Sequence, residues 1–471
     1  MNKIIAFFLL ALTTVAACKK ESPLATQNGT QSFKFPEKTA QSLEQYMKEQ
    51  EQAGFSGTVL VMQKGQVLLR KGYGKANGSI DNTPETKFRI GSITKQFTAA
   101  CILQLAEAGK LSVNDKLSKY FPDFPRGNEV TIHMLLNMTS GIKTYTDPSN
   151  FDISKGLEPV IEEIQTLSKE KDKMIAFIQK LGYEFSPGTK YSYSNSNYSL
   201  LGYIVEKVSG MLYTEYLQQN IFARIGMSNT GVSASGESLV SGAKGYGKGK
   251  LGLPPEILEK MFTPEIAFSA GNLYSTVDDL YKWDRALYGN AILNDASKHK
   301  MFTPGNGISG YGYGFGIYDV AKQYCIGHDG HIPGFNSSIN RFVKGDICIL
   351  VLSNNESDVS SITQSLASIV FDISVYQQPK EVIINTNVLN RYVGQYFSGV
   401  TGQMELIKKN NKLYGKVAGS ELEFKPESET KFFMASSPSQ GIEFEVDAAG
   451  KLVKAWVSNK GERGEELKKM Q

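Results

Sequence analysis

Apolar and polar residues follow a different rhythm in each part of the chain. Residues 39–53 carry apolar side chains at helical spacing. Two strand-like runs follow at 57–63 and 66–72, joined at Lys64-Gly65, and this pattern predicts a hairpin. The chain therefore begins with one helix and a pair of strands.

The middle and the end of the main pattern differ from each other. From residue 92 to about 289 the spacing is mainly helical, with loops marked by proline and glycine. Strand-like runs then return, followed by a helix over 360–375; the runs are 311–318, 322–328, 334–342 and 346–353. Strands at both ends and helices between them predict an α+β fold, in which an antiparallel sheet built from both chain ends has helices on its faces and a mainly helical insertion.

Beyond residue 377 the pattern changes again. Short alternating runs separated by turn signals predict a small, all-β, barrel-like domain. Lys468 and Lys469, near the chain end, are expected to be solvated rather than part of a binding patch. The predicted divisions are a signal peptide (1–17), a lipid-anchored tether (18–36), the main domain (37–376), a linker (377–385) and a C-terminal antiparallel β domain (386–471).

The beginning of the chain has the features of an export signal. The apolar run 4–17 is too short to span a bilayer. It ends in small residues before Cys18, which resembles a bacterial lipobox, where cleavage leaves the cysteine at the N-terminus as a lipid carrier. An ordinary signal peptide, in which Cys18 has no role, is the alternative. We expect an exported lipoprotein that is held at a membrane by Cys18 and faces the periplasm or the cell exterior.

Composition narrows the class of protein. Hydrophobic residues make up 41% of the chain and charged residues 21%, as in ordinary globular proteins. With 51 basic and 47 acidic residues the net charge is only +4, so charge does not suggest a nucleic-acid partner. Four cysteines in 471 residues exclude a disulfide scaffold. Without Cys18, three remain, all in apolar runs (Cys101, Cys325 and Cys348), and we expect buried thiols there.

The first candidate chemistry is a serine followed three residues later by a lysine. Ser92 is predicted to start a helix and Lys95 to share its face. A helix N-terminus stabilises developing negative charge, and a lysine of lowered pKa can accept a serine proton. The spacing is weak evidence by itself, because six such pairs occur, starting at Ser92, Ser140, Ser168, Ser241, Ser297 and Ser428. The alternative for Ser92 is a helix cap with an exposed lysine.

Two further segments carry polar groups. Tyr193-Ser194-Asn195 lies in a polar loop before an apolar helix, where a phenol can act as a base and an amide can bind a carbonyl. The second segment interrupts two strand-like runs and contains glycines that permit close approach of a ligand; it reads His328-Asp329-Gly330-His331. Metal binding is a rival interpretation of the histidines, but no cysteine pair has ligand spacing, and we expect no metal and no cofactor.

Three short motifs therefore come in order along the chain, namely Ser92-x-x-Lys95, Tyr193-x-Asn195 and His328-x-Gly330. This order resembles the serine β-lactamase and penicillin-binding-protein superfamily, most closely its class C-like branch of D,D-carboxypeptidases, D-aminopeptidases and esterases. Segments 135–141 and 269–276 are similar to that branch too, and the resemblance covers roughly residues 40–375.

The resemblance implies a role for each motif residue. Ser92 would be the acylated nucleophile, and Lys95 and Tyr193 would share the work of the general base. Asn195 would bind the substrate amide and Lys95. The backbone N–H groups of Ser92 and His331 would form the oxyanion hole, and His328 and Gly330 would line the substrate site.

The sequence departs from the superfamily at the third motif. Its penicillin-recognising members usually begin that motif with a lysine, whereas this chain has His328, which is largely neutral at pH 7. The difference favours a peptide, amide or ester substrate whose carboxylate is absent or held elsewhere. We expect a serine hydrolase outside the cytoplasm, acting on a small molecule or peptide. The alternative is a penicillin-recognising or cell-wall-binding sensor with little turnover.

Overall fold

A computed structural model describes most of the chain after the predicted tether. The described residues are 37–152, 154, 156–233, 241–246, 263–305, 310–373, 379–398, 402–417, 420–459 and 462–470. The predicted leader, the tether and Cys18 lie outside them.

The main sheet is antiparallel and has six strands in the order β2-β1-β11-β10-β9-β8. Its strands are β1 (Gly57–Gln63), β2 (Gln66–Tyr73), β8 (Gly316–Val320), β9 (Gln323–Ile332), β10 (Phe335–Phe342) and β11 (Ile347–Ser353). β1 and β11 pair in the middle, with Gly57 opposite Ser353 and Gln63 opposite Ile347. The predicted sheet built from both chain ends is therefore confirmed.

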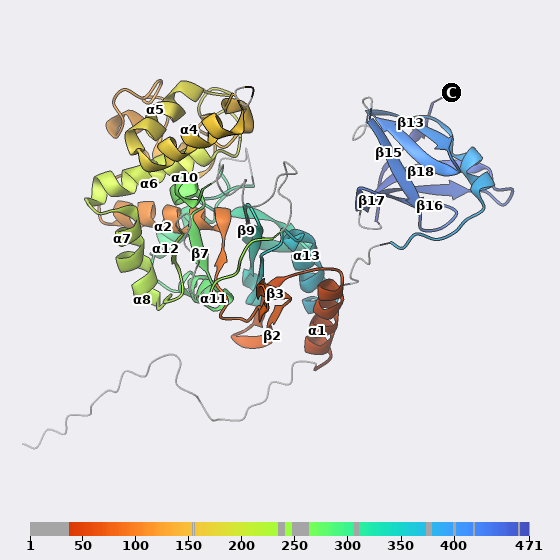
Figure 1. The fold of residues 1–471 in the computed structure, drawn as a ribbon, viewed down its shortest axis with the longest axis horizontal. Coiled ribbons are helices and arrows are strands. Elements are labelled where there is room, and N and C mark those ends of the chain that lie inside the picture. The colour runs from red at the N-terminus through yellow and green to blue at the C-terminus, as the bar shows by residue number, and fades with distance from the viewer. Residues whose placement is uncertain are drawn as a thin grey trace, which may run out of the picture.

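Helices cover both faces of this sheet (Figure 1). On one face, α1 (Glu37–Gln52) and α13 (Val359–Val370) bury Leu43 and Leu366 against Val59 and Val351. On the other face, Leu60 of β1 and Leu350 of β11 pack in a larger core with the helical insertion. Side chains that alternate between the two cores explain why β1 and β11 are mostly apolar, since both faces of each strand are buried.

The insertion is mainly helical, as expected, and carries short strands at its edge. Its helices are α2 (Thr94–Glu107), α3 (Ile132–Leu136), α4 (Leu157–Lys169), α5 (Lys171–Leu181), α6 (Asn195–Ser209), α7 (Tyr213–Leu217), α8 (Ala223–Ile225), α10 (Pro264–Ala267), α11 (Val277–Ala286) and α12 (Asp295–Met301). A three-stranded sheet combines β5 (Phe88–Arg89), β7 (Leu273–Ser275) and β6 (Gly231–Val232), and β3 (Lys75–Asn77) pairs with β4 (Ile80–Asp81). Within the described ranges, no helix is both long enough and apolar enough to cross a bilayer.

Two predicted strand limits were wrong, for different reasons. The run 311–318 forms a strand only from Gly316, because the chain first turns against α2. At Gly314, which has a φ of +74°, a Cβ would lie 2.6 Å from the Lys95 carbonyl oxygen. The histidine segment does not interrupt strands but lies inside β9, and the hairpin turn comes later, at Gly334.

The C-terminal residues form a second sheet with its own hydrophobic core, centred on Tyr392, Leu406 and Phe444. Its strands are β12 (Gly394–Ser398), β13 (Gly402–Lys409), β14 (Lys412–Val417), β15 (Ser420–Pro426), β16 (Lys431–Met434), β17 (Ser437–Val446), β18 (Leu452–Asn459), β19 (Glu462–Glu466) and β20 (Lys468–Lys469). These neighbours pair in sequence order, which confirms the predicted antiparallel meander.

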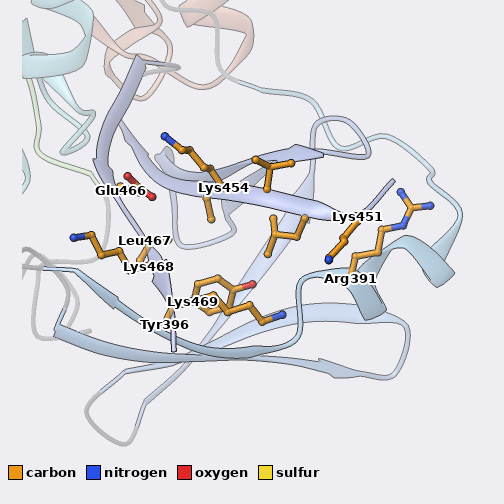
Figure 2. A pocket seen from close by; sticks show the side chains of 11 residues that line it. Arg391, Tyr396, Lys451, Lys454, Glu466, Leu467, Lys468 and Lys469 are labelled. Carbon is orange, nitrogen blue, oxygen red and sulfur yellow. The ribbon is translucent and has the colours of Figure 1, made fainter. Parts of the chain in front are cut away.

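The last strands close this sheet into a barrel. β19 pairs with β18, whereas β20, directly after it, pairs with β12 at the opposite edge. Lys468 and Lys469, expected at a solvated end, are therefore part of the closing strand and lie beside a cleft (Figure 2). The predicted domain boundaries themselves stay predictions.

The three cysteines of the described chain are buried and unpaired, as expected, at Cys101, Cys325 and Cys348. Burial raises the pKa of the Cys325 thiol to about 12. Such thiols remain protonated at neutral pH and serve as small apolar packing groups.

Candidate active site

Ser92 lies where a strand of the small sheet ends and a helix begins. It belongs to a 3₁₀ helix, Gly91–Ile93, that continues into α2. Gly91 has a φ of +51°, and a Cβ there would fall 2.7 Å from the His331 backbone nitrogen. Glycine therefore allows the chain before Ser92 to lie against β9. The Ser92 side chain stays partly exposed.

Lys95 lies one turn after Ser92 and is completely buried. Its Nζ donates to Ser92 Oγ at 3.0 Å, to Asn195 Oδ1 at 2.7 Å and to the Ala270 carbonyl oxygen at 2.8 Å. All three donor positions of an ammonium group are thus used, which fixes the amine beside the serine. The expected helix-face pairing of Ser92 and Lys95 is present.

Burial changes the chemistry of this amine. Desolvation lowers the pKa of Lys95 well below its ordinary value. A lysine in this state loses its proton at a much lower pH than a solvated one, so it can act as a base.

Ser92 and Lys95 are the exception among the six serine–lysine pairs, all of which lie in the described chain. No other pair has hydrogen-bonded side chains there. Ser140 Oγ donates to Asn197, and Ser168 Oγ donates to the Gln165 carbonyl. The sequence spacing alone could not separate these cases, because the distinction depends on where the lysine is buried.

Tyr193 and Asn195 approach the same amine from the start of α6. The Tyr193 ring centroid lies 4.8 Å from Lys95 Nζ. Burial raises the pKa of the Tyr193 phenol, and a hydrogen bond with Ser92 opposes part of that rise. The phenol is therefore a neutral hydroxyl that contacts the serine. Asn195 accepts from Lys95, while its Nδ2 donates to Thr146 Oγ1 at 2.9 Å.

The third motif meets Ser92 through backbone and side chain. A Cβ at Gly330 would lie 2.0 Å from the Ile90 carbonyl oxygen, so only glycine fits this contact. His328 is buried, and its ring centroid lies 6.1 Å from that of Tyr193. Burial and the nearby Lys95 lower the pKa of His328 to about 4. His328 is therefore neutral near pH 7.

The side chains of the histidine segment point to different places. His331 is exposed, and its Nδ1 hydrogen-bonds Asn336 Oδ1 at 2.6 Å. Asp329 accepts at 2.6 Å from both Ser338 and Ser360. Alternation along the strand places His328 on the opposite face from Asp329 and His331, and those two bind different partners. In the part of the chain that the structure describes, no three histidine, cysteine or acidic side chains are grouped to hold a metal ion.

The match to known proteins agrees with this geometry. The family model described as Beta-lactamase matches residues 39–366, more than half of the chain. The chain belongs to the beta-lactamase family. The putative penicillin-binding protein PbpX of Bacillus subtilis (strain 168) is 34% identical over 329 residues, which cover 69% of this chain and 76% of PbpX.

Two solved structures extend the family comparison. The octameric penicillin-binding protein homologue from Pyrococcus abyssi is 27% identical, with a TM-score of 0.63, covering 91% of this chain and 99% of that one. The D-stereospecific amidohydrolase from Streptomyces sp. is 26% identical, with a TM-score of 0.59, covering 69% and 97%. Membership in this family supports serine hydrolase activity in general.

Met138 supports the loop of the site, a role that sequence reasoning missed. It is fully buried, and its sulfur accepts from the Ser194 backbone N–H and from Asn197 Nδ2, both at 3.4 Å. These contacts hold the loop that carries Tyr193 and Asn195. Its φ of +64° gave no sequence signal, since methionine rarely adopts that conformation.

Tyr311 is a second residue that sequence reasoning missed. Its hydroxyl lies 2.9 Å from His328 Nε2, while His328 Nδ1 lies 2.5 Å from the Asp329 carbonyl oxygen. A carbonyl only accepts, so Nδ1 carries the proton and Tyr311 donates to Nε2. Tyr311 begins the run 311–318, where the pattern predicted only a strand.

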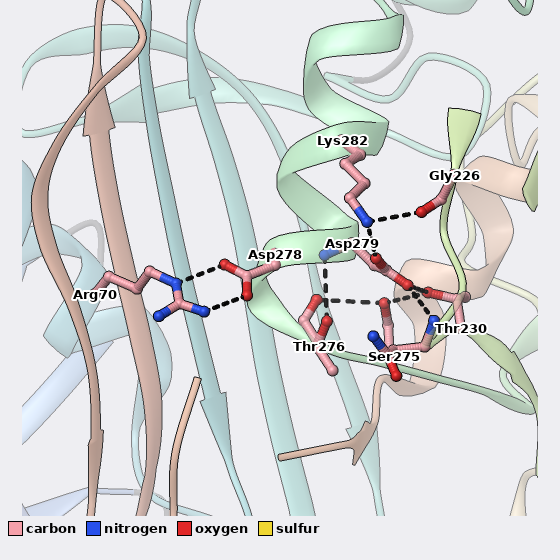
Figure 3. Close-up of polar contacts among 9 residues, drawn as sticks. Arg70, Gly226, Thr230, Ser275, Thr276, Asp278, Asp279 and Lys282 are labelled. Atoms are coloured by element: carbon pink, nitrogen blue, oxygen red, sulfur yellow. Dashed lines mark hydrogen bonds and ion pairs between the residues drawn. The ribbon is translucent and has the colours of Figure 1, made fainter. Parts of the chain in front are cut away.

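The Ala270 carbonyl that binds Lys95 is positioned by the segment before α11. Asp279, in the first turn of α11, is buried beside this segment and accepts from the Asn229 backbone N–H at 2.7 Å and from Lys282 Nζ at 2.8 Å. Figure 3 shows Asp279 among Thr230, Ser275, Thr276 and Lys282, and the separate pair of Arg70 with Asp278. This network anchors β7, which follows the 3₁₀ helix Phe268–Ala270 after two intervening residues.

Proposed function

We propose that the protein is a serine hydrolase that cleaves a peptide, amide or ester bond through an acyl-Ser92 intermediate. The observation that carries this proposal is the buried Lys95 amine, 3.0 Å from Ser92 Oγ and held by two further acceptors. Burying an amine costs folding free energy, and such buried, perturbed groups cluster at functional sites. The burial of Lys95 is therefore best explained by a catalytic use.

Lys95 is the group that takes the serine proton. Burial lowers the pKa of Lys95 and raises the pKa of Tyr193, so near neutral pH the amine is more readily available in its unprotonated, basic form than the phenol is. The Ser92 oxygen attacks the substrate carbonyl carbon as its proton moves to Lys95 Nζ. The proton then passes through the Tyr193 hydroxyl to the leaving nitrogen or oxygen as the scissile bond breaks.

Backbone donors stabilise the tetrahedral intermediate. The Ser92 and His331 N–H groups are the proposed oxyanion hole, and the tight contact of Gly91 with His331 supports this pairing. Water then attacks the acyl carbon, returns a proton to Ser92 and releases the acid. Asn195 orients Lys95 and binds the substrate amide in this scheme, with its Nδ2 exchanging Thr146 for substrate.

The substrate class follows from the third motif. His328 is neutral, since burial lowers its pKa to about 4, and its nitrogens are engaged by Tyr311 and Asp329. It therefore offers no cation to a substrate carboxylate next to the scissile bond. An amide, ester or peptide that lacks such a carboxylate is the preferred substrate. The relation to a D-stereospecific amidohydrolase makes D-amino-acid amides the first compounds to test.

The proposed location is outside the cytoplasm, with Cys18 as the lipid-bearing residue. The support is the short apolar run 4–17 that ends in small residues before Cys18. A small molecule or peptide is the proposed partner at the site, and the membrane is the proposed partner of the N-terminus.

The test is intact-mass spectrometry after exposure to a fluorophosphonate. One adduct is expected on the native chain and none on Ser92→Ala. Ser168→Ala is a matched control, because Ser168 also precedes a lysine by three residues but bonds a backbone carbonyl. That variant should label like the native protein.

Two results would contradict the proposal. One is the absence of an adduct on folded protein. The other is an adduct that persists in Ser92→Ala. A stable adduct with a β-lactam and no turnover of amides or esters would instead favour the sensor that the sequence left open.

A further inference from the structure

The barrel has a cleft at the seam where its last strand changes partner. The Leu467 backbone N–H donates to the Ala455 carbonyl of β18 at 2.8 Å. Three residues later the Met470 N–H donates to the Gln395 carbonyl of β12, also at 2.8 Å. The beginning of β18 is left beside a gap, and the cleft there has a volume of about 520 Å³.

Basic side chains dominate the lining of this cleft (Figure 2). The cleft has five basic lining residues, and all of them are exposed: Arg391, Lys451, Lys454, Lys468 and Lys469. Glu466 is the one acidic residue among the lining side chains. Tyr396 and Leu452 add an apolar floor, and Lys469 Nζ lies 5.6 Å from the Tyr396 ring centroid.

The other lysines of the same barrel are arranged differently. Lys412 pairs with Glu423 at 2.7 Å, and Lys425 pairs with Glu381 at 2.8 Å. Similar pairs hold Lys409 with Glu421, Lys416 with Glu405, Lys431 with Glu443 and Arg463 with Glu443. Within the described residues, none of the five cleft cations forms an ion pair.

This contrast has an energetic meaning. Like charges that line one hollow raise its positive potential and repel one another. Elsewhere on the described barrel most basic side chains have a carboxylate partner, whereas the five around this cleft have none. A bound anion would relieve that repulsion and would release counterions from both partners.

We propose that the cleft binds a linear phosphate-bearing polymer. A chain of phosphates presents several anions in a row, which matches several cations along one hollow better than a single anion does. Lysine ammonium groups bind phosphate oxygens as point charges and require no fixed geometry. The apolar floor of Tyr396 and Leu452 suits the uncharged linkers of such a chain. A polymer chain can enter a concave cleft, whereas a flat membrane surface would contact only the rim of the cleft.

The test measures binding of inorganic polyphosphate to the purified full-length chain by calorimetry. The variant K451Q/K454Q/K468Q/K469Q removes four charges from the cleft. The variant K409Q/K412Q/K416Q/K425Q removes the same charge from paired lysines of the same barrel. We expect the cleft variant to bind at least about tenfold more weakly and the control to stay within about twofold of the native chain, since unpaired cations dominate polyanion binding.

The outcomes separate the alternatives. Equal weakening in both variants would show that only net charge matters, and this result would overturn the proposal. Binding to vesicles of anionic phospholipid without binding to polyphosphate would overturn it in favour of a membrane surface. Absence of polyphosphate binding by the native chain would also overturn the proposal. The variant K451R/K454R/K468R/K469R keeps the charge and should bind like the native chain, which guards against a folding defect.

Discussion

The active site and the barrel cleft use lysine in opposite ways. Lys95 is fully buried with three hydrogen-bond acceptors, so its environment determines its protonation. Lys451 and Lys454 are exposed and have no ion pair within the described chain, so they act on a ligand through the long-range potential of several like charges. Desolvation changes the chemistry of a single amine, whereas exposure preserves the collective charge of several.

The largest expected effect is the loss of the buried amine. Lys95→Met removes the proposed base and should lower kcat/KM for an amide or ester by about 10³-fold or more. Polyphosphate binding should stay unchanged in the same variant. Lys300→Met, which alters the lysine of another serine–lysine pair, is the matched control and should leave kcat/KM near the native value. Retained turnover in Lys95→Met would show that the buried amine is not the base.

The next effect concerns the phenol beside Ser92. Tyr193→Phe keeps the ring over Lys95 but removes the hydroxyl, and kcat/KM should fall by about 10²-fold because proton transfer to the leaving group is impaired. The loss should be smaller for esters with a good leaving group, since those need less protonation. A similar loss for every leaving group would show that the hydroxyl only supports the site.

Salt should separate the two kinds of lysine. Raising the salt concentration from 50 to 200 mM should weaken polyphosphate binding by about tenfold or more, because counterion release drives it. Hydrolysis of an uncharged ester should change by less than about twofold, because Lys95 is shielded from solvent ions. Parallel salt titrations of the two activities provide the measurement. Equal salt sensitivity of both activities would contradict the proposed difference between a shielded and an exposed lysine.

The smallest effect concerns pH and Tyr311. In the native chain kcat/KM should rise with pH as Lys95 loses its proton, well below the ordinary lysine value of about 10.4. His328 should add no inflection near pH 6.5, because its pKa lies at about 4. Tyr311→Phe removes the donor to His328 Nε2, which eases protonation of the ring.

This variant should therefore lose a few-fold in kcat/KM, and the loss should grow as the pH falls toward 5. The measurement is a pH series from 5 to 9 with both proteins. A uniform loss at every pH would mean that Tyr311 has a packing role only.

The sequence supplied the fold class and most of the residues that meet at the site. Ser92, Lys95, Tyr193 and His328 were visible because each is a chemically distinctive residue in a short motif. The Ala270 carbonyl could not be predicted, since every residue has one and only the fold decides which of them faces Lys95.

Long-range closure accounts for most of the remaining misses. Lys468 and Lys469 read as a loose end, because nothing local indicates that the last strand pairs with β12. Met138 acts through its sulfur and Tyr311 through its hydroxyl. Both residue types usually serve as packing, so the residue type alone did not predict a role at the site.

The order of the main sheet bears on how the protein is made. β1 cannot acquire its inner neighbour until β11 has been synthesised, almost three hundred residues later. Until then the hairpin of β1 and β2 has one unpaired edge. The barrel strands instead pair with sequence neighbours, so each can pair soon after it is synthesised. A nascent chain with this topology cannot complete its main sheet until late in synthesis. A polypeptide that is to pass through a narrow translocation channel must likewise remain unfolded until it has crossed.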